Sequence, residues 1–146
     1  MTTSQATHQG LSTESAQPST LALVRRGSSA GAIAAVGTTA VAAAARAADV
    51  SLEVDATPIP IPAFALWTVV GAALGVLMAR LLRARRPFLV VALVATGLSL
   101  VPPMALPDDA ATKAVLVAAH LLAASIIIPI LSQGLPVAAS GGSRDR

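Results

Sequence analysis

Residues 56–79 read ATPIPIPAFALWTVVGAALGVLMA, and none of their side chains is ionisable. This run lies between Asp55 and Arg80, and it is longer than the roughly 20 residues with which a helix crosses about 30 Å of hydrocarbon. Similar runs lie between Arg26 and Arg46, between Arg86 and Asp108, and between Lys113 and Arg144, the last interrupted only by His120. The sequence therefore predicts an all-α fold, a four-helix transmembrane bundle.

The overall composition agrees with this fold class. Of the 146 residues, 55% are hydrophobic and only 12% are charged, whereas soluble domains carry about 25% charged residues. The chain has no cysteine, which excludes disulfides, thiolate metal sites and cysteine nucleophiles. Four of its ten basic residues lie in one short loop between apolar runs, as in proteins oriented in a membrane. We therefore expect the lipid bilayer as a partner, and no nucleic acid.

Three parts are predicted along the chain. Residues 1–24 are rich in Ser, Thr, Gln and Ala and are expected to form a disordered cytoplasmic tail. Residues 136–146 form a second cytoplasmic tail. Between them, residues 25–135 form the transmembrane domain, with helices at about 27–46, 62–82, 87–102 and 109–131.

Shorter signals mark the connections between these helices. Pro102 and Pro103 are expected to end the third helix, so that the last residues of that crossing are irregular. Residues 50–55 alternate apolar and polar side chains, which predicts a short extended segment over the outer surface of the bundle. Asp109 is a suitable N-cap for the fourth helix. Phe64 and Trp67 are expected to lie at the lipid headgroups.

The first apolar run is mostly Ala, Gly, Ser and Thr, so we expect it to be held by neighbouring helices and not by lipid. Small residues let helix backbones approach closely in a membrane. Gly27 and Gly31 form one small-xxx-small pair, and Gly71 and Gly75 form another in the second helix. All four are predicted to be helix-packing residues, the second pair facing the first helix.

The basic residues predict the orientation of the chain. Arg25 and Arg26 precede the first helix, and the loop between the second and third helices is rich in arginine and has no acid. The positive-inside rule then places a multi-pass protein in the cell membrane with its N- and C-termini in the cytoplasm. The loop could also contact anionic lipids, through Arg80, Arg83, Arg85 and Arg86.

A rival interpretation of the first helix is a cleaved signal. Arg25-Arg26 before a weakly apolar run, followed by Ala45-Arg46-Ala47, resembles a twin-arginine signal with a small-x-small cleavage site. Cleavage would leave three helices and an N-terminus outside the cell. Against it, Gly27 and Ser28 replace the bulky residues usual after the arginine pair.

His120 is the one ionisable residue in the interior of a predicted membrane helix, away from its ends. Thr38 in the first helix and Thr96 in the third are expected at similar depth, so the three could form an intramembrane polar cluster. An intramembrane ionisable residue is a candidate proton relay or ligand contact. The structural alternative, which we favour, is a neutral imidazole hydrogen-bonded to a threonine or a backbone carbonyl.

Several short motifs resemble a known family. They are Ala48-Asp49-Val50-Ser51-Leu52-Glu53-Val54, Arg83-Ala84-Arg85-Arg86, His120-Leu121-Leu122-Ala123-Ala124 and Ile128-Pro129-Ile130-Leu131. On these motifs the segment from Ala48 to Leu131 resembles a family of uncharacterised four-helix integral membrane proteins of high-GC Gram-positive bacteria, a domain of unknown function. The resemblance implies a membrane location and a four-helix topology, but no activity or site residue.

No motif for catalysis or phosphate binding is found in the sequence. We therefore expect no enzyme, no cofactor, and no catalytic or metal-binding residue. The favoured hypothesis is a non-enzymatic helical bundle that acts by association with an unknown membrane protein or with itself. The alternative is a small oligomeric transporter or channel subunit that uses His120.

Overall fold

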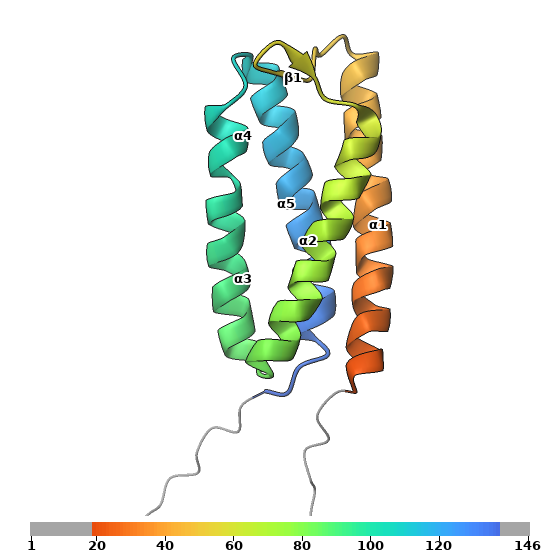
Figure 1. Ribbon diagram of the computed structural model, residues 1–146, viewed down its shortest axis with the longest axis vertical. Coiled ribbons are helices and arrows are strands. Elements are labelled where there is room, and N and C mark those ends of the chain that lie inside the picture. Colours follow the sequence, from red (N-terminus) through yellow and green to blue (C-terminus); the bar gives the residue numbers. More distant parts are fainter. Residues whose placement is uncertain (1–18, 138–146) are drawn as a thin grey trace, which may run out of the picture.

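The computed structural model describes residues 19–137, whose helices run up and down in an antiparallel bundle (Figure 1). Its elements are α1 (Thr20–Ala47), β1 (Glu53–Val54), β2 (Thr57–Pro58), α2 (Ile61–Leu82), α3 (Arg85–Ser99), α4 (Val101–Ala105) and α5 (Ala110–Ser132). With α3 and α4 taken as one segment, Arg85–Ala105, the described residues contain four helices long and apolar enough to cross a membrane, hereafter the spans. The predicted four-helix bundle is confirmed.

Helix α1 begins at Thr20 and not near residue 27, so the prediction that residues 20–24 belong to a disordered tail is wrong. The side chain of Ser19 caps the helix by accepting a hydrogen bond from the Ala22 N–H at 3.3 Å. Leu23, in the first turns, is buried in the core. Burial of this leucine and the serine cap both favour the earlier start. The remainder of the two predicted tails, residues 1–18 and 138–146, lies outside the described residues.

One face of α1 is buried along its whole length, although the helix is the least apolar of the four spans. The buried residues recur mostly at every third or fourth position, and almost all have small side chains: Leu23, Gly27, Ala30, Gly31, Ala34, Thr38, Ala42 and Ala45. The helix packs chiefly against α2 and α5. Small side chains allow this close approach, so α1 is held by protein contacts.

The contacts of the four predicted packing glycines differ from the prediction. A Cβ added at Gly27 would collide with Val76, and one added at Gly31 would come within 2.8 Å of Ala72, so both glycines face α2. A Cβ at Gly71 would meet nothing within 4 Å, and one at Gly75 would meet Leu131 of α5. The prediction that Gly71 and Gly75 face the first helix is therefore wrong. The face of α2 turned to α1 carries Ala72 and Val76 instead.

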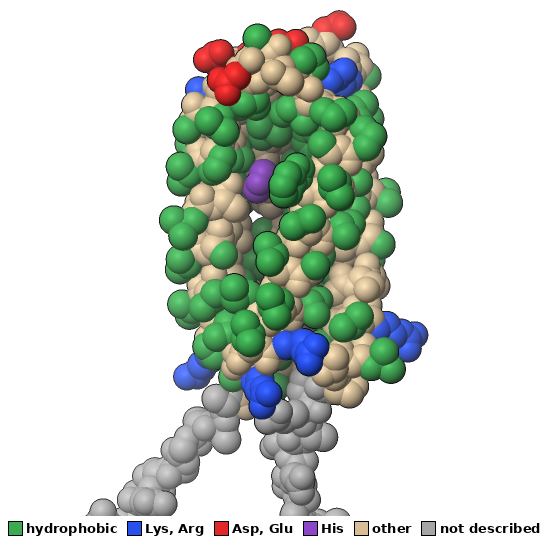
Figure 2. Space-filling model, in the orientation of Figure 1, with side chains coloured by type: hydrophobic (Ala, Val, Ile, Leu, Met, Phe, Trp, Pro, Cys, Tyr) green, Lys and Arg blue, Asp and Glu red, His purple; other side chains and the backbone are tan. Residues whose placement is uncertain are grey.

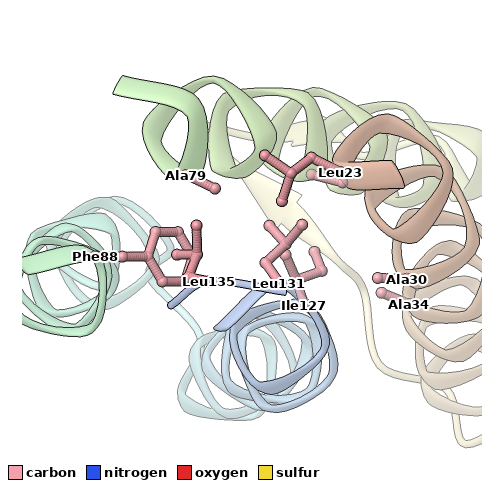
Figure 3. Close-up of a cluster of buried hydrophobic side chains, with 9 residues drawn as sticks. Leu23, Ala30, Ala34, Ala79, Phe88, Ile127, Leu131 and Leu135 are labelled. Carbon is pink, nitrogen blue, oxygen red and sulfur yellow. The ribbon is translucent and has the colours of Figure 1, made fainter. Parts of the chain in front are cut away.

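A core of aliphatic side chains fills the space between the helices at the end opposite the hairpin (Figure 3). Ile127 and Leu131 of α5 lie beside Leu23, Ala30 and Ala34 of α1, and the ring of Phe88 from α3 lies against Leu135. Phe88 is the only buried residue of α3. The third span is therefore attached mainly through one aromatic ring at this end.

The proline pair does not stop the helical path of the third span. Pro102 and Pro103 occupy the first turn of α4, where a missing N–H breaks no hydrogen bond of that helix. The break falls at Leu100, two residues before Pro102, and helical hydrogen bonding resumes when the Met104 N–H donates to the Leu100 carbonyl at 3.2 Å. The expected irregular ending is therefore a short second helix.

A β-hairpin with two residues in each strand covers the other end of the bundle. Asp55 and Ala56 adopt positive φ values of 50° and 57°, as the turn of a tight hairpin requires, and Val54 pairs with Thr57. Leu52, just before the hairpin, is fully buried in a second core with Phe64. The extended segment predicted at residues 50–55 is confirmed only at Glu53–Val54, because Leu52 and Asp55 both have positive φ values. The hairpin closes the bundle at this end, hereafter the hairpin end.

Candidate functional site

Charged side chains gather at the two ends of the bundle, and apolar side chains cover its flanks (Figure 2). Among the described residues, the end opposite the hairpin carries only basic charges, the exposed Arg25, Arg26, Arg80, Arg83, Arg85 and Arg86, hereafter the arginine end. The hairpin end carries an excess of acids: Asp49, Glu53, Asp55, Asp108 and Asp109, with Arg46 and Lys113. The structure thus brings the two predicted basic clusters together on one side.

Arg46 and Asp109 organise the hairpin end. The Arg46 guanidinium donates to the Ile59 carbonyl at 2.9 Å and so ties the end of α1 to the segment before α2. The Asp109 carboxylate caps α5 by accepting from the backbone N–H groups of Thr112 at 2.7 Å and Ala111 at 3.2 Å. The Thr112 N–H, then the Thr112 hydroxyl and the Ala111 N–H, lower the pKa of Asp109 below its ordinary value of 3.8.

His120 lies half-buried on α5, with Nδ1 2.9 Å from the Leu116 carbonyl oxygen of its own helix. A carbonyl only accepts, so Nδ1 carries the hydrogen and donates it. In the neutral ring this leaves Nε2 as an acceptor. The tautomer of His120 is therefore set by its own helix.

The expected cluster of His120, Thr38 and Thr96 is not joined by hydrogen bonds. Thr96 donates to the Ala92 carbonyl of its own helix at 2.8 Å. Thr38 Oγ1 lies 2.9 Å from Thr68 Oγ1 of α2, and both threonines are buried. Thr68 is a polar residue that the sequence prediction missed, although it carries the only hydroxyl group of α2.

A pocket of about 210 Å³ lies beside His120. It is lined by residues of the hairpin, the third span and α5: Val54, Ser99, Pro102, Pro103, Leu106, Leu116 and His120. In Figure 2 the purple imidazole lies at the edge of a hollow on the flank of the bundle. Within residues 19–137, no three His, Asp or Glu side chains are grouped so that they could hold a metal ion.

Comparison with known proteins gives a family but no activity. The model of a family of unknown function (DUF6069) matches residues 18–136, which contain all the elements described above. No curated protein and no solved structure matches the chain.

Proposed function

Because the chain belongs to the family of unknown function DUF6069, which assigns it no activity, we propose a role from its geometry: a non-enzymatic membrane protein that acts by association. Its partner is another membrane protein or a second copy of the chain. Four apolar helices indicate a multi-pass membrane protein, and in lipid such helices associate by packing and interhelical hydrogen bonds.

The observation that carries this proposal is where the polar side chains of the spans make their hydrogen bonds. Seven of them bond to a carbonyl three or four residues earlier in their own helix: Ser29, Thr68, Thr96, Ser99, His120, Ser125 and Ser132. Thr38 pairs instead with Thr68 of the neighbouring helix. Among the described residues no buried side-chain N or O atom lacks a partner. Polar side chains whose hydrogen bonds are made within the protein in this way favour a structural role over catalysis.

The third span offers the surface for association. Only Phe88 and Pro103 of its residues are buried, whereas Leu93 is 63% exposed and Leu98 67% exposed. Most of its circumference is thus in contact with lipid and available to another helix. Association there would replace lipid contacts with protein contacts and leave the core of α1, α2 and α5 unchanged.

The arginine end supports a cytoplasmic location for the two termini of the chain, by the positive-inside rule. Helix α1 starts at this end and α5 finishes there (Figure 1). Its exposed guanidinium groups also suit anionic lipid headgroups, which attract juxtamembrane basic residues by about 1 kcal/mol each. Anionic lipid contact is therefore part of the proposal.

A transport role receives less support from the same geometry. It would need polar groups that line a continuous path, but Thr38 bonds to Thr68 and Thr96 to its own helix. His120 is therefore not hydrogen-bonded to either threonine. The association hypothesis accounts for all three residues without requiring an oligomeric pore.

Photo-crosslinking in native membranes tests the proposal. A photoreactive residue replaces Leu93 in the full chain, and a matched control variant carries it at Val69 of α2, which is 51% exposed. We expect one discrete protein adduct from position 93, reproduced when the identified partner and the chain are purified and mixed. Lipid adducts alone at both positions, with a monomeric chain in nanodiscs, would refute association through the third span.

A further inference from the structure

We infer that the pocket beside His120 binds a membrane-soluble molecule with a phenol-type hydroxyl on an apolar body, which enters from the lipid. This site is separate from the proposed association surface at Leu93, because it lies where the hairpin, the third span and α5 meet. The argument rests on the hydrogen-bonding capacity, the size and the opening of the pocket.

The two polar side chains that line the pocket, His120 and Ser99, offer only hydrogen-bond acceptors. His120 uses its Nδ1 hydrogen on the Leu116 carbonyl, which leaves the Nε2 lone pair. The Ser99 hydroxyl donates to the Thr96 carbonyl at 2.7 Å, so its oxygen has only lone pairs left to offer. The complementary group on a ligand is therefore a donor.

The proline pair adds a third acceptor. In a continuous helix the Ser99 carbonyl would accept from the N–H of residue 103, but Pro103 has no N–H. A backbone carbonyl without a donor is costly in hydrocarbon, where no water can replace the missing partner. A hydroxyl group in this pocket could serve either the Ser99 carbonyl or His120 Nε2.

The rest of the lining is apolar and limits the size of the ligand. Val54, Leu106, Leu116 and the two proline rings line an open pocket of about 210 Å³. An apolar cavity of about 150 Å³ is known to hold benzene, so this volume takes one substituted six-membered ring. It is below the roughly 300 Å³ at which pockets enclose a whole drug-sized ligand. The apolar chain of the ligand would therefore stay in the lipid.

The opening of the pocket faces the lipid. The hollow in Figure 2 lies on the flank between the two charged ends, amid apolar side chains. The third span, which forms one wall, is the least buried of the four spans. A ligand can therefore enter sideways without crossing either polar end of the bundle.

Nitrogen NMR of the full chain in nanodiscs tests the inference. The protein has two histidines, and a His8→Gln variant labelled with ¹⁵N-histidine reports on His120 alone. The probe is 4-nonylphenol, and its matched control is 4-nonylanisole, the methyl ether, which has the same shape but no donor. We expect the phenol to shift the Nε2 resonance saturably, at about one molecule per chain, and the ether to leave it unchanged.

Variants distinguish binding of the phenol in the pocket from its general partitioning into lipid. His120→Phe should weaken phenol binding about threefold to tenfold, the range expected for loss of one hydrogen bond. Leu106→Trp, which fills the pocket, should abolish binding and covers the case in which the His120 variant fails to fold. Ser125→Ala removes a hydroxyl elsewhere on α5 and should bind as the parent does. Equal binding of phenol and ether, or uptake that never saturates, would overturn the inference.

Discussion

Thr38 Oγ1 of α1 and Thr68 Oγ1 of α2 lie 2.9 Å apart in a buried contact between two spans. Each hydroxyl has one hydrogen. Thr68 lies 2.7 Å from the Phe64 carbonyl, which can only accept, whereas Thr38 lies 3.2 Å from the Ala35 carbonyl. The shorter bond assigns the Thr68 hydrogen to Phe64, so Thr38 donates across the interface. One directional hydrogen bond therefore links α1 to α2.

The first prediction concerns this bond. Thr38→Val removes its donor and Thr68→Val its acceptor, and both changes keep the shape of the side chain. Each single variant should lower the free energy of unfolding by about 0.6 kcal/mol, and by no more than about 1.7 kcal/mol. The double variant should cost about as much as the larger single change, because both remove the same bond. Additive losses in unfolding measurements in bicelles would contradict the pairing.

The second prediction compares two glycines. Gly27→Ala places a methyl group against Val76, whose branched side chain has little freedom to move. It should lower the free energy of unfolding by about 1–3 kcal/mol, the range for overpacking. Gly71→Ala points into open space and should cost no more than about 0.5 kcal/mol. Similar losses for the two variants would show that α1 and α2 pack in another register.

The third prediction concerns the Asp109 cap and its pH dependence. The pKa of Asp109 is lowered in the folded chain, so the carboxylate contributes stability above the ordinary value of 3.8 and loses it as pH falls through the folded pKa. Asp109→Ala should therefore lower the thermal midpoint at neutral pH. Asp109→Asn, which also caps helices, should lower it by less than Asp109→Ala does.

Thermal melts of these variants in detergent, from pH 7 down to below 3.8, measure both effects. The advantage of the parent over Asp109→Asn should be greatest at neutral pH and should shrink in acid, because asparagine does not titrate. A difference independent of pH would mean that the charge of Asp109 does not contribute.

The fourth prediction concerns which end of the bundle faces the outside of the cell. The chain has no cysteine, so Ser51→Cys before the hairpin and Ala84→Cys at the arginine end give single-thiol proteins. In intact cells a membrane-impermeant maleimide should label position 51 and not position 84. Permeabilised cells supply the control, in which both positions should react. Labelling of position 84 from outside would reverse the proposed orientation.

The fifth prediction is that α1 stays in the mature protein. Its buried face contributes Thr38 and the glycines that contact α2, and Arg46 is bonded to the Ile59 carbonyl. Cleavage after Ala47 would expose the facing sides of α2 and α5. Intact mass measured on C-terminally tagged protein from membranes should therefore include residues 20–47, and a mature N-terminus at Ala48 would support the signal interpretation.

Some features of the site had a local signal in the sequence and others did not. His120 was identified because it interrupts an apolar run, and Asp109 because of its place before a helix. Thr38 was expected beside His120 but bonds to Thr68, and Phe64, expected at the headgroups, is buried while Trp67 is 70% exposed. Depth along a helix can be counted from the sequence, whereas the direction of a side chain around the helix axis cannot.

The sequence by itself determined how many spans the chain has, where their charges lie, and that the first must be held by its neighbours. Those properties depend on the length and composition of each segment, which are local. Only the tertiary structure decided which glycines make contacts, which threonines pair and what surrounds His120. A helix that is apolar on all sides has no polar stripe to show which face is buried, so its rotation is set by packing against the other helices.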